Sequence, residues 1–98
     1  MSRQDTIGTH KTHIETDADG VHVRYHATRV ASLAPDGTIT LRTGGWRTVT
    51  TKKRMNQALA TWGSPYRVYQ EDHEWYVQPL PYGAATPFHF DSDTLVLP

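Results

Sequence analysis

Within residues 21–30, apolar and polar residues alternate as far as Thr28, which is the pattern of a half-buried β-strand with one polar face. The side chains on the polar face are those of His22, Arg24, His26 and Thr28. We expect this strand to continue to Leu33. Pro35-Asp36-Gly37 then favours a turn into a return strand over residues 38–42, because proline presets φ and glycine tolerates positive φ. Residues 21–42 are therefore a predicted β-hairpin.

The spacing of apolar residues becomes helical after the hairpin. The apolar stripe of the predicted helix consists of Met55, Ala58, Leu59 and Trp62. We expect the helix to cover residues 52–62, with Thr50 or Thr51 as its N-cap, since a threonine hydroxyl can accept a hydrogen bond from the first helical turn. Gly63 is suited to the position that ends a helix.

Short strands follow the helix. They are predicted over residues 66–70, 74–78, 88–90 and 94–97, with a tight turn at residues 71–73 and a loop rich in proline and glycine at residues 79–87. The order is ββ-α-ββ-ββ. This order predicts an α+β fold, in which one helix packs on an antiparallel sheet of about four to six short strands. Residues 1–20 show no periodicity and are expected to form a flexible or partner-dependent arm, before a single domain over residues 21–98.

The amino-acid composition limits the kinds of functional site that the chain can form. The chain of 98 residues has no cysteine, which excludes disulfides, thiolate zinc sites and a thiol nucleophile. The formal net charge is zero, but residues 37–70 hold six cations and no acid. A basic middle in a neutral chain favours a small anionic ligand over general nucleic-acid binding. We find no signal peptide and no apolar run of transmembrane length, so no membrane partner is expected.

The segment from Gly44-Gly45 to the predicted helix start has the features of an anion site. Two glycines, hydroxyl side chains and cations precede a helix N-terminus, where backbone N–H groups and the helix dipole favour phosphate. The candidate ligand-binding residues in this segment are Trp46, Arg47, Thr48, Thr50, Thr51 and Lys52. The spacing matches neither a Walker A loop nor a dinucleotide fingerprint. The alternative is a tight turn with a core tryptophan and an ordinary helix cap.

His26 and Thr28 form a second candidate group, because they share the polar face of the first strand with Arg24. His-x-Thr pairs occur in metal-independent phosphoesterases, where two such units flank a phosphate. A second copy, His10-Lys11-Thr12, lies in the unpatterned arm. If the protein is an enzyme, His26 and Thr28 are the predicted catalytic pair. The alternative is a strand histidine that hydrogen-bonds its neighbours.

The alternation of His89, Asp91 and Asp93 could hold a metal, but a polar turn explains these residues more simply. We therefore expect neither a metal nor a cofactor.

Residues 25–28 and 36–57 resemble a family of small bacteriophage proteins. The shared pattern is His-x-Thr followed by Gly-Gly-Trp-x-Thr-x-Thr-Thr-Lys and then Arg-Met-Asn. The resemblance leaves out residues 1–20 and the proline-rich loop, and it brings no established enzyme activity. It implies phage origin and a location in the cytoplasm of the infected bacterium.

Together these features predict a phage protein that binds and sequesters a phosphate-bearing nucleotide signal, of the cyclic nucleotide or ADP-ribose type, to counter host immunity. A homo-oligomer is expected, since the core is small. Two alternatives stay open. One is a metal-independent phosphodiesterase that uses His26 and Thr28. The other is an interaction protein that binds a host protein or nucleic acid through Lys52, Lys53 and Arg54, although zero net charge and the absence of a reading motif disfavour nucleic acid.

Overall fold

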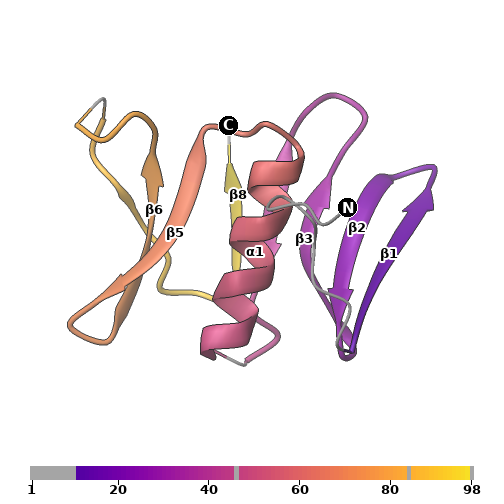
Figure 1. The fold of residues 1–98 in the computed structure, drawn as a ribbon, viewed down its shortest axis with the longest axis horizontal. Coiled ribbons are helices and arrows are strands. Elements are labelled where there is room, and N and C mark those ends of the chain that lie inside the picture. Colours follow the sequence, from indigo (N-terminus) through magenta and orange to yellow (C-terminus); the bar gives the residue numbers. More distant parts are fainter. Residues whose placement is uncertain (1–10, 46, 84, 98) are drawn as a thin grey trace, which may run out of the picture.

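The structure is a computed structural model and describes residues 11–45, 47–83 and 85–97. Within these residues the chain forms eight β-strands and one α-helix (Figure 1). The strands before the helix are β1 (Thr12–Asp17), β2 (Gly20–Tyr25), β3 (Thr28–Leu33) and β4 (Ile39–Arg42). After the helix α1 (Val49–Thr61) come β5 (Tyr66–Glu71), β6 (Glu74–Pro79), β7 (Phe88–His89) and β8 (Thr94–Leu97).

The strands form two antiparallel sheets. The first has five strands in the order β1-β2-β3-β4-β8, and the second has three in the order β5-β6-β7. The C-terminal strand β8 returns to the first sheet and pairs with β4, with Leu95 opposite Leu41. Helix α1 contacts β2 and β3 of the first sheet and β5 of the second (Figure 1). The predicted α+β class is confirmed, whereas the division of the strands into two sheets was not predicted.

The hydrophobic core lies between α1 and the two sheets. Met55, Ala58 and Leu59 of the predicted apolar stripe are buried, and Trp62 packs against the same cluster. The sheets contribute Val23, Val30, Ala31, Ile39, Leu41, Val68, Trp75, Val77 and Leu97. Helical spacing on α1 and alternation on the strands therefore aim their apolar side chains at one shared core.

The helix begins one turn earlier than predicted. Its N-cap is Thr48, whose hydroxyl oxygen accepts a hydrogen bond from the Thr51 N–H at 3.1 Å. The prediction of Thr50 or Thr51 as N-cap is wrong, because both residues lie inside the helix. Gly63 ends the helix as predicted, with a φ of 66° that suits glycine.

The strand predicted over residues 21–33 is broken by a two-residue turn at His26-Ala27, which joins β2 to β3. His26 has a φ of 56°, and tight hairpins require positive φ in their turns to match the twist of the strands. Tyr25 pairs with Thr28 across the turn. The prediction that His26 and Thr28 share one strand face is therefore wrong. His26 lies at the hairpin tip, and Thr28 opens the next strand.

Residues 12–17, within the predicted arm, form the strand β1. This strand pairs with β2 along its whole length, from Thr12 opposite Tyr25 to Asp17 opposite Gly20. A hairpin therefore spans the boundary that was predicted after residue 20. Alternation did not reveal β1 because Ile14 is its only apolar residue. Residues 1–10 of the predicted arm lie outside the described residues.

Candidate functional site

A cavity of about 330 Å³, called the pocket below, lies between the β2–β3 turn, the glycine loop (residues 43–45) and the start of α1. Its lining residues are Tyr25, His26, Ala27, Thr28, Val30, Thr43, Thr48 and Thr51. The volume is at the lower end of the range for small-molecule sites. Two segments that are distant in sequence, at residues 25–30 and 48–51, therefore line one cavity.

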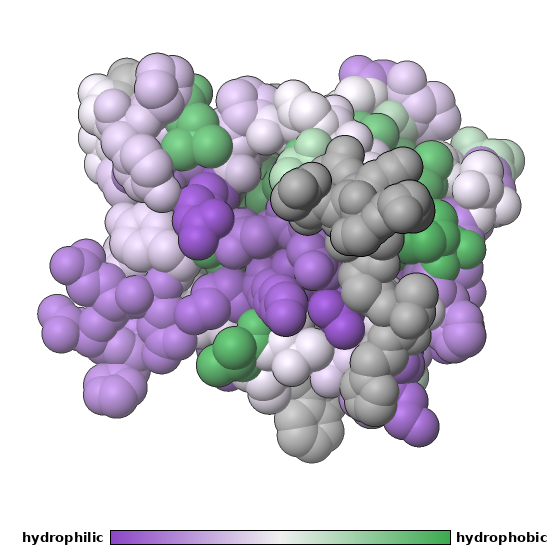
Figure 2. Space-filling model, viewed as in Figure 1, coloured by the Kyte–Doolittle hydropathy of each residue, from purple (hydrophilic) through white to green (hydrophobic). Residues whose placement is uncertain are grey.

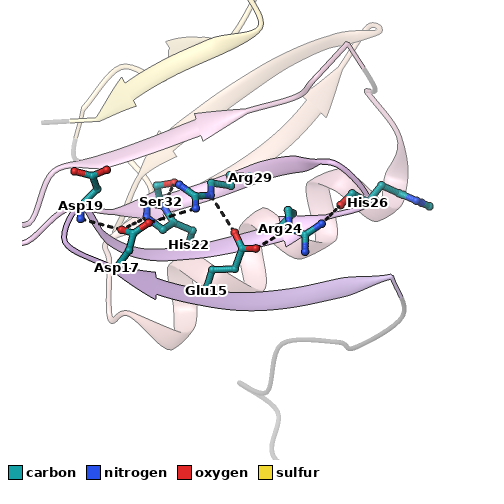
Figure 3. Close-up of polar contacts among 8 residues, drawn as sticks. All are labelled: Glu15, Asp17, Asp19, His22, Arg24, His26, Arg29 and Ser32. Atoms are coloured by element: carbon teal, nitrogen blue, oxygen red, sulfur yellow. Dashed lines mark hydrogen bonds and ion pairs between the residues drawn. The ribbon is translucent and has the colours of Figure 1, made fainter.

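The β2–β3 turn brings His26 to the pocket. The His26 ring meets the Tyr25 ring edge-on, with 4.4 Å between their centroids. The backbone of His26 is held at both of its polar groups. Its N–H donates to the Lys11 carbonyl at 2.8 Å, and its carbonyl accepts from the Arg24 guanidinium at 3.0 Å (Figure 3). The turn is thus fixed while the side chain of His26 stays exposed.

Asp93, in the segment before β8, fastens the glycine loop. One of its carboxylate oxygens accepts hydrogen bonds from the Thr43 hydroxyl at 2.6 Å and from the Gly45 N–H at 2.9 Å. The hydrogen bond from Thr43, followed by that from Gly45, lowers the pKa of Asp93 below its ordinary value. Gly44 lies against Thr28 and has a φ of 63°, and a Cβ at this glycine would lie 2.2 Å from the Thr28 hydroxyl oxygen. The glycine loop therefore reaches the hairpin only because residue 44 has no side chain.

The start of α1 supplies hydroxyl and amide groups to the pocket. The hydroxyl oxygens of Thr48 and Thr51 lie 3.0 Å apart and share a hydrogen bond, and Thr51 is fully buried. The first amides of any helix lack a partner within that helix, and they form the positive end of its dipole. This wall of the pocket is therefore polar without carrying a formal charge.

The two cations next to the helix start contact the protein itself. The Arg47 guanidinium donates to the carbonyls of Phe90 and Ser92, both at 2.8 Å, and lies 5.4 Å from the centre of the Trp75 ring. The Lys52 ammonium lies 5.7 Å from the centre of the same ring. Both cations thus join α1 and the preceding loop to the second sheet, and neither lines the pocket.

The remaining predicted cations are also dispersed. Arg24 donates to Glu15 at 2.9 Å, on the sheet face turned away from α1 (Figure 3). Arg54 is only 7% exposed and donates to the Thr12 hydroxyl at 2.9 Å. Lys53 is the one exposed member of the predicted surface at residues 52–54. These cations do not form a continuous basic patch.

The pocket contains some of the predicted ligand-binding residues and omits others. His26, Thr28, Thr48 and Thr51 line it. Arg24, Arg47, Thr50 and Lys52 do not. Trp46 lies outside the described residues. Sequence reasoning missed Tyr25, Ala27 and Val30, which it had assigned to a strand, and Thr43, which follows the predicted return strand. The sequence feature that could have identified Tyr25 and Ala27 as pocket residues is their position on either side of His26, a predicted site residue.

Asp17, His22 and Ser32 form a hydrogen-bonded chain outside the pocket (Figure 3). His22 Nε2 lies 3.0 Å from Asp17 Oδ1, and His22 Nδ1 lies 2.7 Å from Ser32 Oγ. A carboxylate only accepts hydrogen bonds, so in the neutral imidazole Nε2–H donates to Asp17 and Nδ1 accepts from the serine hydroxyl. The order of groups resembles a hydrolytic triad, but His22 is only 4% exposed and no member lines the pocket. This chain therefore ties β1, β2 and β3 together.

Two further features of the described residues bear on function. α1, their only helix, is neither long nor apolar enough to span a membrane. Over the same residues, no three His, Asp or Glu side chains are grouped to hold a metal ion.

Comparison with known proteins places the chain in a family. No curated protein and no solved structure matches it. The family model described as Kyanoviridae Gp96 protein matches residues 1–95. The chain therefore belongs to this family of phage proteins.

Proposed function

We propose that this phage protein binds a small phosphate-bearing nucleotide in the pocket and sequesters it from the signalling of the infected host. The observation that carries the proposal is the convergence of the hairpin tip with the helix start on one cavity. His26 and Thr28 come from the first segment, and Thr48 and Thr51 come from the second. An apolar pocket with a few convergent polar groups is the usual form of a small-ligand site.

The pocket walls suit a base or a ribose. Tyr25, Ala27 and Val30 supply apolar surface, and contact of a base with an aromatic ring contributes about 1–3 kcal/mol. The hydroxyl group of Thr28 can hydrogen-bond a ribose or a base edge. These groups would orient the uncharged part of the ligand.

A phosphate would lie at the start of α1. The amides next to Thr48 and the positive end of the helix dipole favour an anion there. The residues that line the pocket include no arginine or lysine, and His26 adds a positive charge only when it is protonated. A site of such low charge favours ligands of the cyclic nucleotide or ADP-ribose type over a triphosphate.

The phage family supports the biological context of this proposal. Bacterial immune systems use nucleotide messengers, and in the cytoplasm of an infected bacterium a binding protein would lower the free concentration of such a messenger. Tight binding without turnover is sufficient for this role.

Calorimetric titration tests the proposal. Cyclic dinucleotides, cyclic and linear ADP-ribose and the matching phosphate-free nucleosides would be titrated into three proteins: the wild type, His26→Gly and His73→Gly. His73 is the matched control, because it is exposed and also has positive φ in a two-residue turn, but it does not line the pocket. Both variants relieve the same kind of backbone strain.

We expect a phosphate-bearing nucleotide to bind the wild type and His73→Gly equally. Binding to His26→Gly should be about tenfold weaker, which corresponds to the loss of one hydrogen bond. Nucleosides without phosphate should bind more weakly than their nucleotides. The absence of binding by every nucleotide would end the proposal.

A specific contact favours a second candidate, a metal-independent phosphodiesterase. The His26 N–H donates to the Lys11 carbonyl and Thr12 pairs with Tyr25, so residues 11 and 12 of the second His-x-Thr unit lie beside the β2–β3 turn. Its His10 lies outside the described residues. Incubation of the protein with a nucleotide, followed by heating and chromatography, separates the two candidates. Intact ligand supports sequestration, whereas a product that disappears in His26→Gly but persists in His73→Gly supports cleavage.

A further inference from the structure

β1 forms one end of the five-stranded sheet, and no described strand pairs with its outer edge (Figure 1). It has six residues, whereas the edge strands β7 and β8 have two and four. The edge of β5 is blocked at its third residue by Asn56, whose side-chain amide accepts from the Val68 N–H at 2.7 Å and donates to the Val68 carbonyl at 2.9 Å. β1 therefore presents a long sheet edge with which no described strand pairs, and such edges tend to pair with another strand.

The register of the β1–β2 hairpin shows which backbone groups point outward. In an antiparallel pair, residues alternate between bonding toward the neighbouring strand and pointing away from it. The His26 N–H donates to the Lys11 carbonyl, so His13 and Glu15 also direct their backbone groups toward β2. Ile14 and Thr16 then direct their N–H and carbonyl groups to the outer edge. The Ile14 side chain is 55% exposed.

The sequence of β1 is complementary to itself about Ile14. Suppose that two copies pair antiparallel with Ile14 opposite Ile14. His13 of each copy then faces Glu15 of the other. An imidazole, which is a hydrogen-bond donor and becomes a cation on protonation, thus meets a carboxylate on each side of the central isoleucine pair. No such pattern exists in β8, which contains no charged residue.

We propose that β1 pairs with β1 of a second copy in this register, so that two five-stranded sheets join into one across a twofold axis at Ile14. Such an interface is isologous, because each copy contributes the same strand. The backbone groups of Ile14 and the exposed side chain of this residue are covered together. Glu15 keeps its hydrogen bonds to Arg24 and Arg29 within its own chain, since these lie on the sheet face and not at the edge.

Disulfide trapping tests the partner and the register together. The chain has no cysteine, so a single substitution gives an unambiguous cross-link. Directly opposite residues of a hydrogen-bonded pair have Cα atoms about 5.5 Å apart, which a disulfide can bridge. We expect full-length Ile14→Cys to form a covalent dimer under mild oxidation. The matched control is Val96→Cys on the edge strand β8, where Val96 is 58% exposed, and it should form no covalent dimer.

Sedimentation of the unmodified chain provides an independent measurement. The wild type should sediment as a dimer at high micromolar concentration. Ile14→Lys should sediment as a monomer with an unchanged circular dichroism spectrum, because two lysines would meet at the axis. Three results would each overturn the proposal: a monomeric wild type, equal cross-linking of the two cysteine variants, or a folded Ile14→Cys that does not cross-link.

Discussion

Gly44 and Thr28 show how single residues shape the pocket. They lie 16 positions apart in sequence, yet a Cβ on Gly44 would lie 2.2 Å from the Thr28 hydroxyl oxygen. Their contact places the glycine loop against the β2–β3 hairpin. Asp93 holds the same loop from its other side through Thr43 and Gly45. The shape of the pocket therefore depends on one missing side chain and one carboxylate.

Gly44→Ala should destabilise the fold more than Gly45→Ala. Both glycines have positive φ, which costs a non-glycine residue about 1–2 kcal/mol, but a Cβ at Gly45 meets nothing within 4 Å. The collision with Thr28 should add about 1–3 kcal/mol for Gly44→Ala, and urea unfolding measures the difference. In a Thr28→Ala background this added cost should shrink. Equal costs for the two alanine variants would show that the loop does not press on the hairpin.

Stability at acidic pH should depend on Asp93. Its pKa is lowered in the folded chain, so its stabilising effect is complete above the unfolded pKa of about 4 and is lost as pH falls through the folded pKa. Asp93→Asn should therefore reduce stability at neutral pH and flatten the loss of stability on acidification. Thermal unfolding of both proteins from about pH 7 to about pH 3 provides the comparison. Parallel stability curves would contradict this role, since other carboxylates contribute equally to both proteins.

The start of α1 and the β2–β3 hairpin form most of the pocket, and the glycine loop completes it. The Thr48 hydroxyl oxygen caps α1 by accepting from the Thr51 N–H, and it also shares a hydrogen bond with the Thr51 hydroxyl. The two side chains that stabilise the start of α1 therefore also line the cavity. Ligand binding in the pocket, as proposed, would therefore involve the same side chains that stabilise the helix start.

Thr48→Ala should lower the free energy of unfolding by about 1 kcal/mol, the usual effect of losing an N-cap. Thr50→Ala is the matched control, because Thr50 lies inside the helix, where alanine is favoured. Its stability should be unchanged or slightly higher. Chemical denaturation of the two variants shows whether Thr48 or Thr50 is the N-cap. A larger loss of stability in Thr50→Ala than in Thr48→Ala would support Thr50 as the N-cap.

The elements differ in how far the sequence could predict them. α1 and its buried stripe follow from helical spacing, and Gly63 marks the helix end. The turn at His26-Ala27 was missed because a two-residue turn preserves the alternation of side chains and because neither residue is a typical turn former. The pairing of Arg47 with the Phe90 carbonyl joins residues 43 positions apart, and no local pattern contains such information.

In the molecule as a whole, charged side chains lie mainly at the surface and at contacts between the helix and the sheets. Figure 2 shows a largely hydrophilic surface over α1 and the hairpin tip of the second sheet. Arg47 and Lys52 link the helix region to that sheet, while the pocket opens beside the first sheet. The cluster of cations in residues 37–70 therefore marks contacts between elements of the fold. It does not identify the side chains that line the cavity.

Amide chemical shifts measured during a nucleotide titration test the central claim most directly. If the hairpin tip and the helix start form one site, the amides of residues 25–28 and 48–51 should shift together and saturate at the same ligand concentration. The amide of His73, at the far hairpin, should stay unchanged. Shifts confined to one of the two segments, or to the second sheet, would contradict the account of a shared nucleotide pocket.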